Sequence, residues 1–415
     1  MKRLILCCDG TWNHSVNTEV SNIEKLARSV RVGVQEDGAV QVVGYVGGVG
    51  ARGYLADRLL GGAFGLGFTR NVVEGYRFLA MNYEPGDQII VLGYSRGAYT
   101  ARSVVGMVSQ VGLLKPEAID AGMLCKAEET YRLRQPTPHA LGRAQEQVAD
   151  PGAGSRARRK AARLVAHARE VRSQKLRFKT TYSHKNVRIA LLGVFDTVGA
   201  LGVPGPSRRR SKFHDVSLAS NVDRARQALA IDERRLTFAP CLWEVPDDAP
   251  PGRVEQVWFP GTHGDVGGGG ARCGLSDIAL LWMADEIRDV GVLLDTGRLP
   301  VCNGEKPELV LNQAPPAAFR VLNAVKRMRP RYSIVDGRPT FRSGLRILAQ
   351  PGTDAGTWRD GVMLAGSAVR YVAEARYDQA APNLRWWLEA AGGVQAVPVE
   401  PVRAAADDVR QLTLV

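Results

Sequence analysis

Residues 87–102 read Asp87-Gln-Ile-Ile-Val-Leu-Gly-Tyr-Ser-Arg-Gly-Ala-Tyr-Thr-Ala-Arg102. The apolar run at residues 89–92 predicts a short buried strand, and residues 98–108 favour a helix. The chain between them must turn sharply, and Gly93 and Gly97 lack the Cβ atoms that would collide in such a turn. We therefore expect Ser95 to project above a sheet as a candidate nucleophile. The alternative is a glycine–serine loop that only joins strand to helix.

The length and composition indicate a protein with a substantial core. The chain has 415 residues, of which 45% are apolar, so one large domain with insertions or two domains are expected. Its six cysteines show no paired metal-ligand spacing, which predicts free thiols in a reducing compartment and no zinc site.

The first apolar run stops at Asp9, too early for a signal peptide, and no stretch is apolar enough to cross a bilayer. These features predict synthesis and folding in the cytosol. Export by a secretion system that needs no signal sequence, or peripheral binding to a membrane, stays open.

The positive charge is concentrated in one segment. The whole chain carries +13, and residues 131–180 hold 13 Lys or Arg against three acidic residues, a net +10. Such a segment fits an anionic membrane surface, and the alternative is the solvated face of a helical insertion. No aromatic residues interleave with the charges between Arg132 and Arg177, which argues against a nucleic-acid surface.

The first predicted strand, residues 3–8, leads into Asp9-Gly-Thr-Trp-Asn13. Ligands of open α/β sheets bind at the carboxyl ends of the strands, so the backbone N–H groups of Gly10 and Thr11 are candidate oxyanion donors. They would complement the N–H of Arg96, directly after the serine. An ordinary tight turn is the alternative. A helix over residues 22–32, capped by Ser21, and a strand over residues 40–46 are expected to follow.

Two further strands end in residues suited to acid–base chemistry. Residues 186–195 are followed by Asp196, and residues 254–259 run into a glycine-rich loop that contains His263. The chain order Ser95, Asp196, His263 is the order of the catalytic triad in α/β hydrolases. Asp196 as a helix cap or turn residue is the alternative. The other five histidines lack this setting.

The chain resembles the α/β hydrolase family that is related to type VI secretion phospholipase effectors of the first class, long catalogued as a domain of unknown function. The resemblance spans residues 1 to about 290 and rests on these stretches: Cys8-Asp-Gly-Thr-Trp-Asn13, Pro85-Gly-Asp87, Gly93-Tyr-Ser-Arg-Gly-Ala-Tyr-Thr-Ala-Arg102, Phe195-Asp-Thr-Val-Gly-Ala-Leu-Gly202, Ala230-Ile-Asp-Glu-Arg-Arg235, Trp258-Phe-Pro-Gly-Thr-His-Gly-Asp-Val-Gly-Gly-Gly269 and Leu275-Ser-Asp-Ile-Ala-Leu-Leu-Trp-Met283. It implies Ser95 as nucleophile, His263 as base and Asp196 as the acidic partner.

The expected activity is hydrolysis of a carboxylic ester through an acyl-enzyme, with no cofactor required. The resemblance favours a glycerophospholipid cut by an A1- or A2-type phospholipase, and it implies secretion-machinery or immunity partners. The alternatives are a non-lipid carboxylesterase or amidase, and an inactive binding or scaffold protein. Asp265 is the alternative acid, and Asp9 with Asp265 is a candidate site for a divalent cation.

The expected fold is α/β-hydrolase-like, a mostly parallel sheet with helices on both faces. We expect a catalytic domain over residues 1–295 with a basic helical insertion at about 125–182. Residues 296–415 then form a C-terminal extension, which is a lid, a substrate- or membrane-docking region, or a packed extension of the core. Prolines at positions 300, 307, 315 and 316 mark this boundary.

Overall fold

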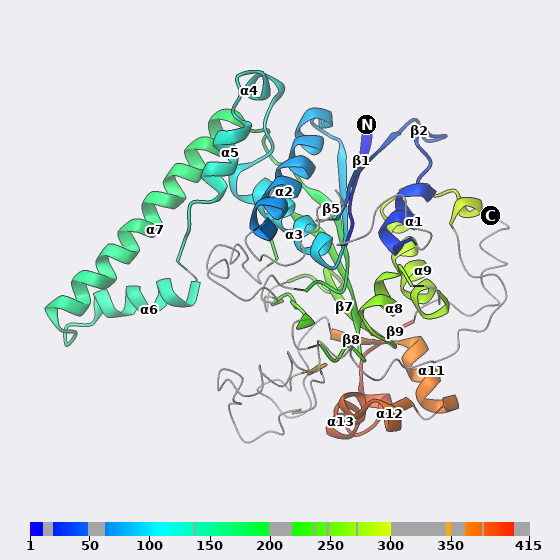
Figure 1. Ribbon diagram of the computed structural model, residues 1–415. Helices are drawn as coiled ribbons and strands as arrows, with labels where there is room; N and C mark the ends of the chain where they lie inside the picture. The colour runs from blue at the N-terminus through cyan, green and yellow to red at the C-terminus, as the bar shows by residue number, and fades with distance from the viewer. Residues whose placement is uncertain are drawn as a thin grey trace.

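The structure is a computed structural model that describes residues 1–10, 20–48, 63–136, 138–198, 218–235, 238–245, 249–270, 273–299, 346–349, 362–375 and 377–401. Its centre is a nine-stranded sheet of order β2-β3-β1-β4-β5-β6-β7-β8-β9 (Figure 1). The strands are β1 Lys2–Cys8, β2 Gly33–Val34, β3 Val40–Val46, β4 Gln88–Tyr94, β5 Ile189–Phe195, β6 Val222–Ala230, β7 Val254–Phe259, β8 Val362–Ala365 and β9 Val399–Glu400. All pairs are parallel except β2–β3, so the predicted mostly parallel α/β sheet is confirmed.

Helices cover both faces of this sheet (Figure 1). They are α1 Asn22–Ser29, α2 Ala63–Asn82, α3 Arg96–Val111, α4 Pro116–Asp120, α5 Leu124–Tyr131, α6 Pro138–Ala149, α7 Ser155–Tyr182, α8 His263–Gly267, α9 Gly274–Asp289, α11 Gly366–Ala375, α12 Tyr377–Ala380 and α13 Pro382–Ala391, with 3-10 turns at Thr296–Arg298 and Val394–Ala396. Within the ranges described, no helix combines the length and the apolar character needed to cross a membrane.

Successive side chains of the central strands alternate between the two faces of the sheet, and this explains why helices pack on both faces. In β1, Leu4 and Leu6 pack into a core cluster with α2 and α3, whereas Ile5 and Cys7 pack into a second cluster with α1 and α9. Successive side chains of a strand point to opposite faces, so an unbroken apolar run is buried on both sides. The parallel strands carry the residues that follow them to one common edge.

Residues after 345 contribute to the same sheet. Strand β8 pairs with β7, and β9 pairs with β8. Trp387 of α13 and Tyr377 of α12 are fully buried in the core cluster on the α1 and α9 side. The described part of the predicted C-terminal extension is therefore packed onto the core, while the domain boundary near residue 295 stays a prediction.

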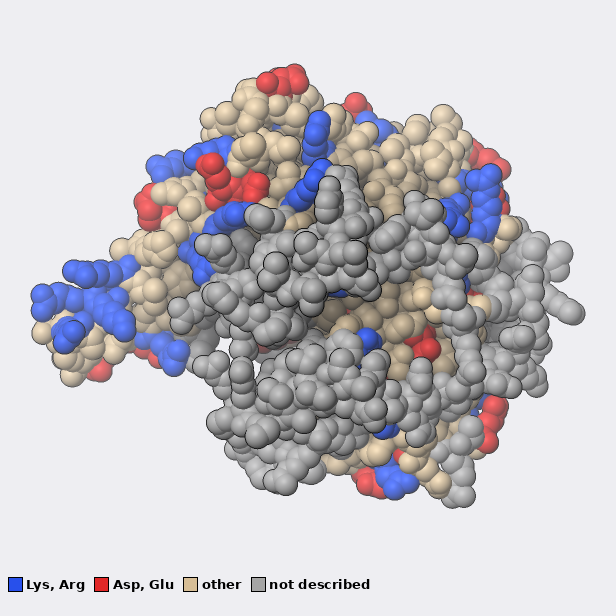
Figure 2. Space-filling model, viewed as in Figure 1, with Lys and Arg blue, Asp and Glu red and all other residues tan. Residues whose placement is uncertain are grey.

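The basic insertion is an arm built from α6 packed against the 28-residue α7, and it projects from the body (Figure 1). Its base is fixed to α3, because Lys175 Nζ donates to Gln110 Oε1 at 2.5 Å and Lys179 Nζ donates to the Ser109 carbonyl at 2.8 Å. Lys175 is buried, which lowers its pKa to about 8. Thus Lys175 does not belong to the exposed basic surface, which lies farther out along the arm (Figure 2).

The cysteine prediction holds only in part. Cys7, Cys8, Cys125 and Cys241 are free thiols, but Cys273, before α9, is disulfide-bonded. The expectation of free thiols is therefore wrong for Cys273. Sequence spacing does not reveal which cysteines a fold brings within bonding distance.

Candidate active site

Ser95 lies at the turn between β4 and α3, in a backbone conformation that few residues other than glycine adopt. Its φ is 57° and its ψ is −116°. A Cβ on Gly93 would lie 2.6 Å from the Ala98 Cα, and a Cβ on Gly97 would lie 2.1 Å from the Cys8 carbonyl oxygen. The two glycines are thus required by close backbone approach, which is the physical reason expected from the sequence.

We predict that Gly97→Ala destabilises the fold by about 3 kcal/mol or more. The added methyl group would collide with main-chain atoms of Cys8 and Asp9, which cannot move aside as a flexible side chain could. The matched control is Gly142→Ala in α6, where a Cβ meets nothing within 4 Å. In a helix this second change is expected to stabilise by about 0.5–1 kcal/mol. Urea unfolding measures both variants, and equal stability for Gly97→Ala and the wild type would contradict the steric argument.

The structure brings Ser95, Asp196 and His263 together from three strand ends. Ser95 Oγ lies 2.8 Å from His263 Nε2, and Asp196 Oδ2 lies 2.5 Å from His263 Nδ1. An imidazole with its proton on Nδ1 donates to Asp196 and accepts from Ser95. All three residues are buried, with Ser95 6% exposed and His263 5% exposed. This geometry suits a general base that takes the proton of a nucleophile.

Two aromatic rings pack against the imidazole of His263. The Tyr94 ring centroid is 4.9 Å away, and the Phe238 ring stands edge-on at 5.0 Å. The Tyr94 hydroxyl donates to the His263 carbonyl at 3.2 Å, which connects the residue before the nucleophile to the histidine. These contacts limit the ring to a small range of orientations.

Asp196 has a charged partner that the sequence analysis did not identify. Arg346 Nη1 donates to Asp196 Oδ1 at 2.6 Å and Arg346 Nη2 donates to Oδ2 at 2.9 Å. Burial alone would raise the pKa of the Asp196 carboxyl, but the charge of Arg346 and the hydrogen bond from His263 lower the pKa below its ordinary value. Asp196 is therefore an anion throughout the neutral pH range.

The predicted oxyanion donors lie around the same strand ends. Arg96 is the first residue of α3, so its N–H belongs to the amino end of a helix that begins beside Ser95. The Gly10 N–H donates to Asp9 Oδ1 at 2.6 Å, so a role as oxyanion donor requires that this bond be exchanged for one to the substrate. Thr11 lies outside the described residues.

Asp9 and Asp265, predicted as an alternative acid or a cation site, have other partners. Asp9 is buried, and its Oδ2 accepts hydrogen bonds from Ser21 Oγ and Tyr45 Oη, each at 2.6 Å. Asp265 Oδ2 accepts from the Thr262 N–H and hydroxyl, each at 2.8 Å, so it caps the start of α8. Its described partners are thus on Thr262, while Asp196 contacts the His263 ring.

The cation itself stays a prediction. Where the structure describes the chain, the acidic, His or Cys ligand atoms of three residues come close together at Glu255, Glu286 and Glu400. Arg226 forms ion pairs with the first two, at 3.1 and 2.6 Å. A guanidinium already balances part of the negative charge there, so we assign no metal to this group.

Two carboxylates that follow β6, Asp232 and Glu233, accept hydrogen bonds from the backbone of the loop that carries His263. The His263 N–H donates to Glu233 Oε2 at 3.3 Å, and Glu233 is held in an ion pair by Arg235 at 2.6 Å. Asp232 accepts from the Gly261 N–H at 2.7 Å and from the Tyr377 hydroxyl, and its burial raises its pKa to about 6. Both carboxylates fix the loop that carries His263.

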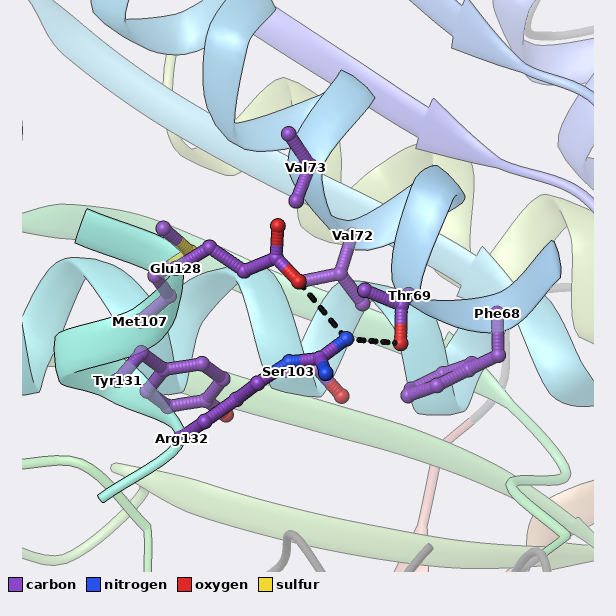
Figure 3. A pocket seen from close by; sticks show the side chains of 9 residues that line it. All are labelled: Phe68, Thr69, Val72, Val73, Ser103, Met107, Glu128, Tyr131 and Arg132. Atoms are coloured by element: carbon purple, nitrogen blue, oxygen red, sulfur yellow. Dashed lines mark hydrogen bonds and ion pairs between the residues drawn. The ribbon is translucent and has the colours of Figure 1, made fainter. Parts of the chain in front are cut away.

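A small hollow lies beside α3, between α2 and α5 (Figure 3). Its lining residues are Phe68, Thr69, Val72, Val73, Ser103, Met107, Glu128, Tyr131 and Arg132. Arg132 crosses it, bonding Glu128 at 2.7 Å and Thr69 at 2.9 Å. Its volume of about 20 Å³ holds roughly one water molecule, so we assign no substrate to it.

Comparison with known proteins identifies relatives. The uncharacterized protein YEL023C of Saccharomyces cerevisiae is 28% identical over an alignment of 254 residues, which covers 57% of this chain and 32% of the yeast protein. This chain thus matches about a third of the length of that relative. A crystal structure of an uncharacterized protein from Pseudomonas aeruginosa aligns with 100% of this chain and 62% of its own, at 16% identity and a TM-score of 0.34.

A family comparison covers most of the chain. The sequence model described as "T6SS, Phospholipase effector Tle1-like, catalytic domain" matches residues 2–286, a range that contains Ser95, Asp196 and His263. This match covers more than half of the chain. The chain therefore belongs to the family of the Tle1-like catalytic domain of type VI secretion phospholipase effectors.

Proposed function

We propose that this chain is a serine-dependent ester hydrolase, a phospholipase of the A1 or A2 type that acts on glycerophospholipids through an acyl-enzyme. The observation that carries the proposal is the hydrogen-bonded series Ser95–His263–Asp196, with distances of 2.8 and 2.5 Å. Membership of a family described by phospholipase effectors supports the choice of substrate.

In the proposed reaction His263 Nε2 takes the Ser95 proton while Ser95 Oγ attacks the ester carbonyl. Asp196 stabilises the imidazolium that forms, and the Arg96 N–H with a second donor at Gly10 or Thr11 stabilises the oxyanion. The imidazolium then gives its proton to the leaving alcohol. Water, deprotonated by His263, hydrolyses the acyl-Ser95 ester and releases the carboxylic acid. This chemistry requires no cofactor.

The experiment that tests the substrate class compares phospholipid vesicles with a soluble short-chain ester. Free fatty acid is measured with the wild type, and Ser95→Ala provides the blank. A phospholipase is expected to prefer the aggregated lipid. Equal or greater turnover of the soluble ester would support a non-lipid esterase instead, and absence of Ser95-dependent release from either would support an inactive scaffold.

The arm of α6 and α7 is a candidate contact with the membrane. Lys and Arg side chains gather at its outer end (Figure 2), and Arg156, Arg159, Lys160 and Arg163 are exposed there. We propose that this surface binds anionic lipid headgroups. The family description also supports delivery by a type VI secretion system and an immunity partner, both of which we propose without assigning residues.

Replacing these four residues with alanine is expected to weaken binding to anionic vesicles by about 10³-fold, at about 1 kcal/mol for each basic residue near the surface. Flotation at low and high salt measures the binding, which is expected to fall with salt. The matched control replaces Arg31, Arg70, Arg77 and Lys185, which are exposed elsewhere. If binding does not change with the anionic lipid content of the vesicles, the proposed membrane contact is wrong.

A further inference from the structure

Arg346 reaches the candidate site from a part of the chain far from the three residues that form it. Its side chain is buried, with the whole residue 5% exposed. Besides both oxygens of Asp196, its guanidinium donates to the Ala230 carbonyl at 2.9 Å and to the Phe238 carbonyl at 2.7 Å. Four hydrogen bonds therefore fix the plane of the guanidinium.

The carboxylate of Asp196 is held equally firmly. Oδ1 accepts from the Ala230 N–H at 3.1 Å and from Arg346, while Oδ2 accepts from His263 Nδ1 and from Arg346. A bidentate arginine–carboxylate pair fixes orientation as well as charge. Asp196 also has a φ of 40°, a conformation that surrounding contacts must sustain.

Arg346 is itself held by α13. Asn383 Nδ2 donates to the Arg346 carbonyl at 3.2 Å and to the Ile231 carbonyl at 3.0 Å. The same amide thus connects the backbone of Arg346 to the stretch that follows β6. This arrangement places the guanidinium before any substrate binds.

We propose that Arg346 is a positioning residue of this site, which holds the Asp196 carboxylate in the plane and orientation that the His263 ring requires. This inference rests on the proposed hydrolase function. It assigns a role in that function to residues beyond 286, where the match to the family ends.

Arg346 also affects the electrostatic environment of the His263 ring. The charge of Arg346 partly balances the charge of Asp196, and a variant without Arg346 would leave the full charge of that carboxylate facing the imidazole. Within the described part of the chain, ionisable groups near the ring and the carboxylate include Glu233, Arg235 and Tyr94. Glu233 and Arg235 form an ion pair with each other, so they cannot replace the balance that Arg346 supplies.

The test compares Arg346→Met, Arg346→Lys and the wild type in Ser95-dependent hydrolysis. Misplacing a catalytic group by about 1 Å costs about 10²-fold, so kcat of Arg346→Met is expected to fall by about that factor with KM nearly unchanged. Arg346→Lys keeps the charge without the paired donors and is expected to lie between the two. The acidic limb of the kcat/KM profile is expected to move to higher pH in Arg346→Met.

Arg226→Met is the matched control, because Arg226 is a buried arginine that pairs with Glu255 and Glu286 instead of Asp196. It is expected to lower the unfolding temperature without moving the pH profile. If Arg346→Met does not fold, kcat and the pH profile of kcat/KM are compared between Arg346→Lys and the wild type instead.

A fluorophosphonate probe separates failure of this inference from failure of the proposed function. Ser95 Oγ displaces fluoride from phosphorus while His263 accepts the proton, so labelling needs the activated serine but no particular lipid. Slow labelling of a folded Arg346 variant is the expected result. Equal labelling and equal pH profiles in wild type and variants would overturn the role of Arg346 alone. No labelling of the wild type would overturn both proposals.

Discussion

Replacing Ser95 with alanine is expected to lower ester hydrolysis by about 10⁴- to 10⁶-fold, the loss seen when a serine nucleophile is removed from a triad. The physical reason is that the acyl-enzyme cannot form once the oxygen 2.8 Å from His263 Nε2 is absent. The measurement is fatty acid release from phospholipid vesicles at saturating substrate. The fold should be unaffected, because the change removes one atom at a turn whose backbone is set by its glycines.

Ser103→Ala is the matched control for this variant. Ser103 lies on α3 and is buried, and its Oγ donates to the Tyr99 carbonyl at 2.5 Å within the same helix. Its replacement is expected to leave kcat unchanged. A Ser95→Ala protein that retains wild-type activity would exclude Ser95 as nucleophile and leave the inactive scaffold or a different catalytic centre.

Local steric rules made the turn around Ser95 predictable from the sequence. An apolar strand, a serine between glycines and a helix leave few ways for the chain to turn, and the structure places the turn where these rules expect it. Strands β3 and β7 have the predicted bounds, and Ser21 caps α1 through a bond from the Glu24 N–H at 3.1 Å. Each of these features depends on neighbours in the sequence.

Features that depend on distant partners were missed. Strand β6 includes Arg226 and Gln227, and two polar residues in succession are not typical of a buried strand. Their partners Glu286 and Thr197 are distant in the sequence and come near only in the folded chain. Arg346 lacks any local signal, since its partner Asp196 is 150 positions away. A sequence can show that an arginine is present but not that it will pair with a triad carboxylate.

Asp196→Asn is expected to lower kcat by about 10⁴-fold, as in other triads where an amide replaces the carboxylate. An asparagine cannot stabilise the imidazolium, and its NH₂ group would face either the His263 ring or the guanidinium of Arg346, both of which need an acceptor. Activity is measured on vesicles and with the fluorophosphonate probe, and folding is followed by thermal unfolding.

Asp265→Asn separates the two candidate acids. Asp265 caps α8 through Thr262, so its replacement is expected to cost about 1 kcal/mol of stability, the usual value of a helix cap, with a much smaller loss of kcat. Addition of divalent cations to both variants tests the ion predicted near Asp9. If Asp265→Asn instead shows the larger fall in kcat in a folded protein, then Asp265 supplies the catalytic charge. The Asp196–Arg346 pair would in that case be structural only, because a carboxylate that orients the base must affect turnover more than one that caps a helix.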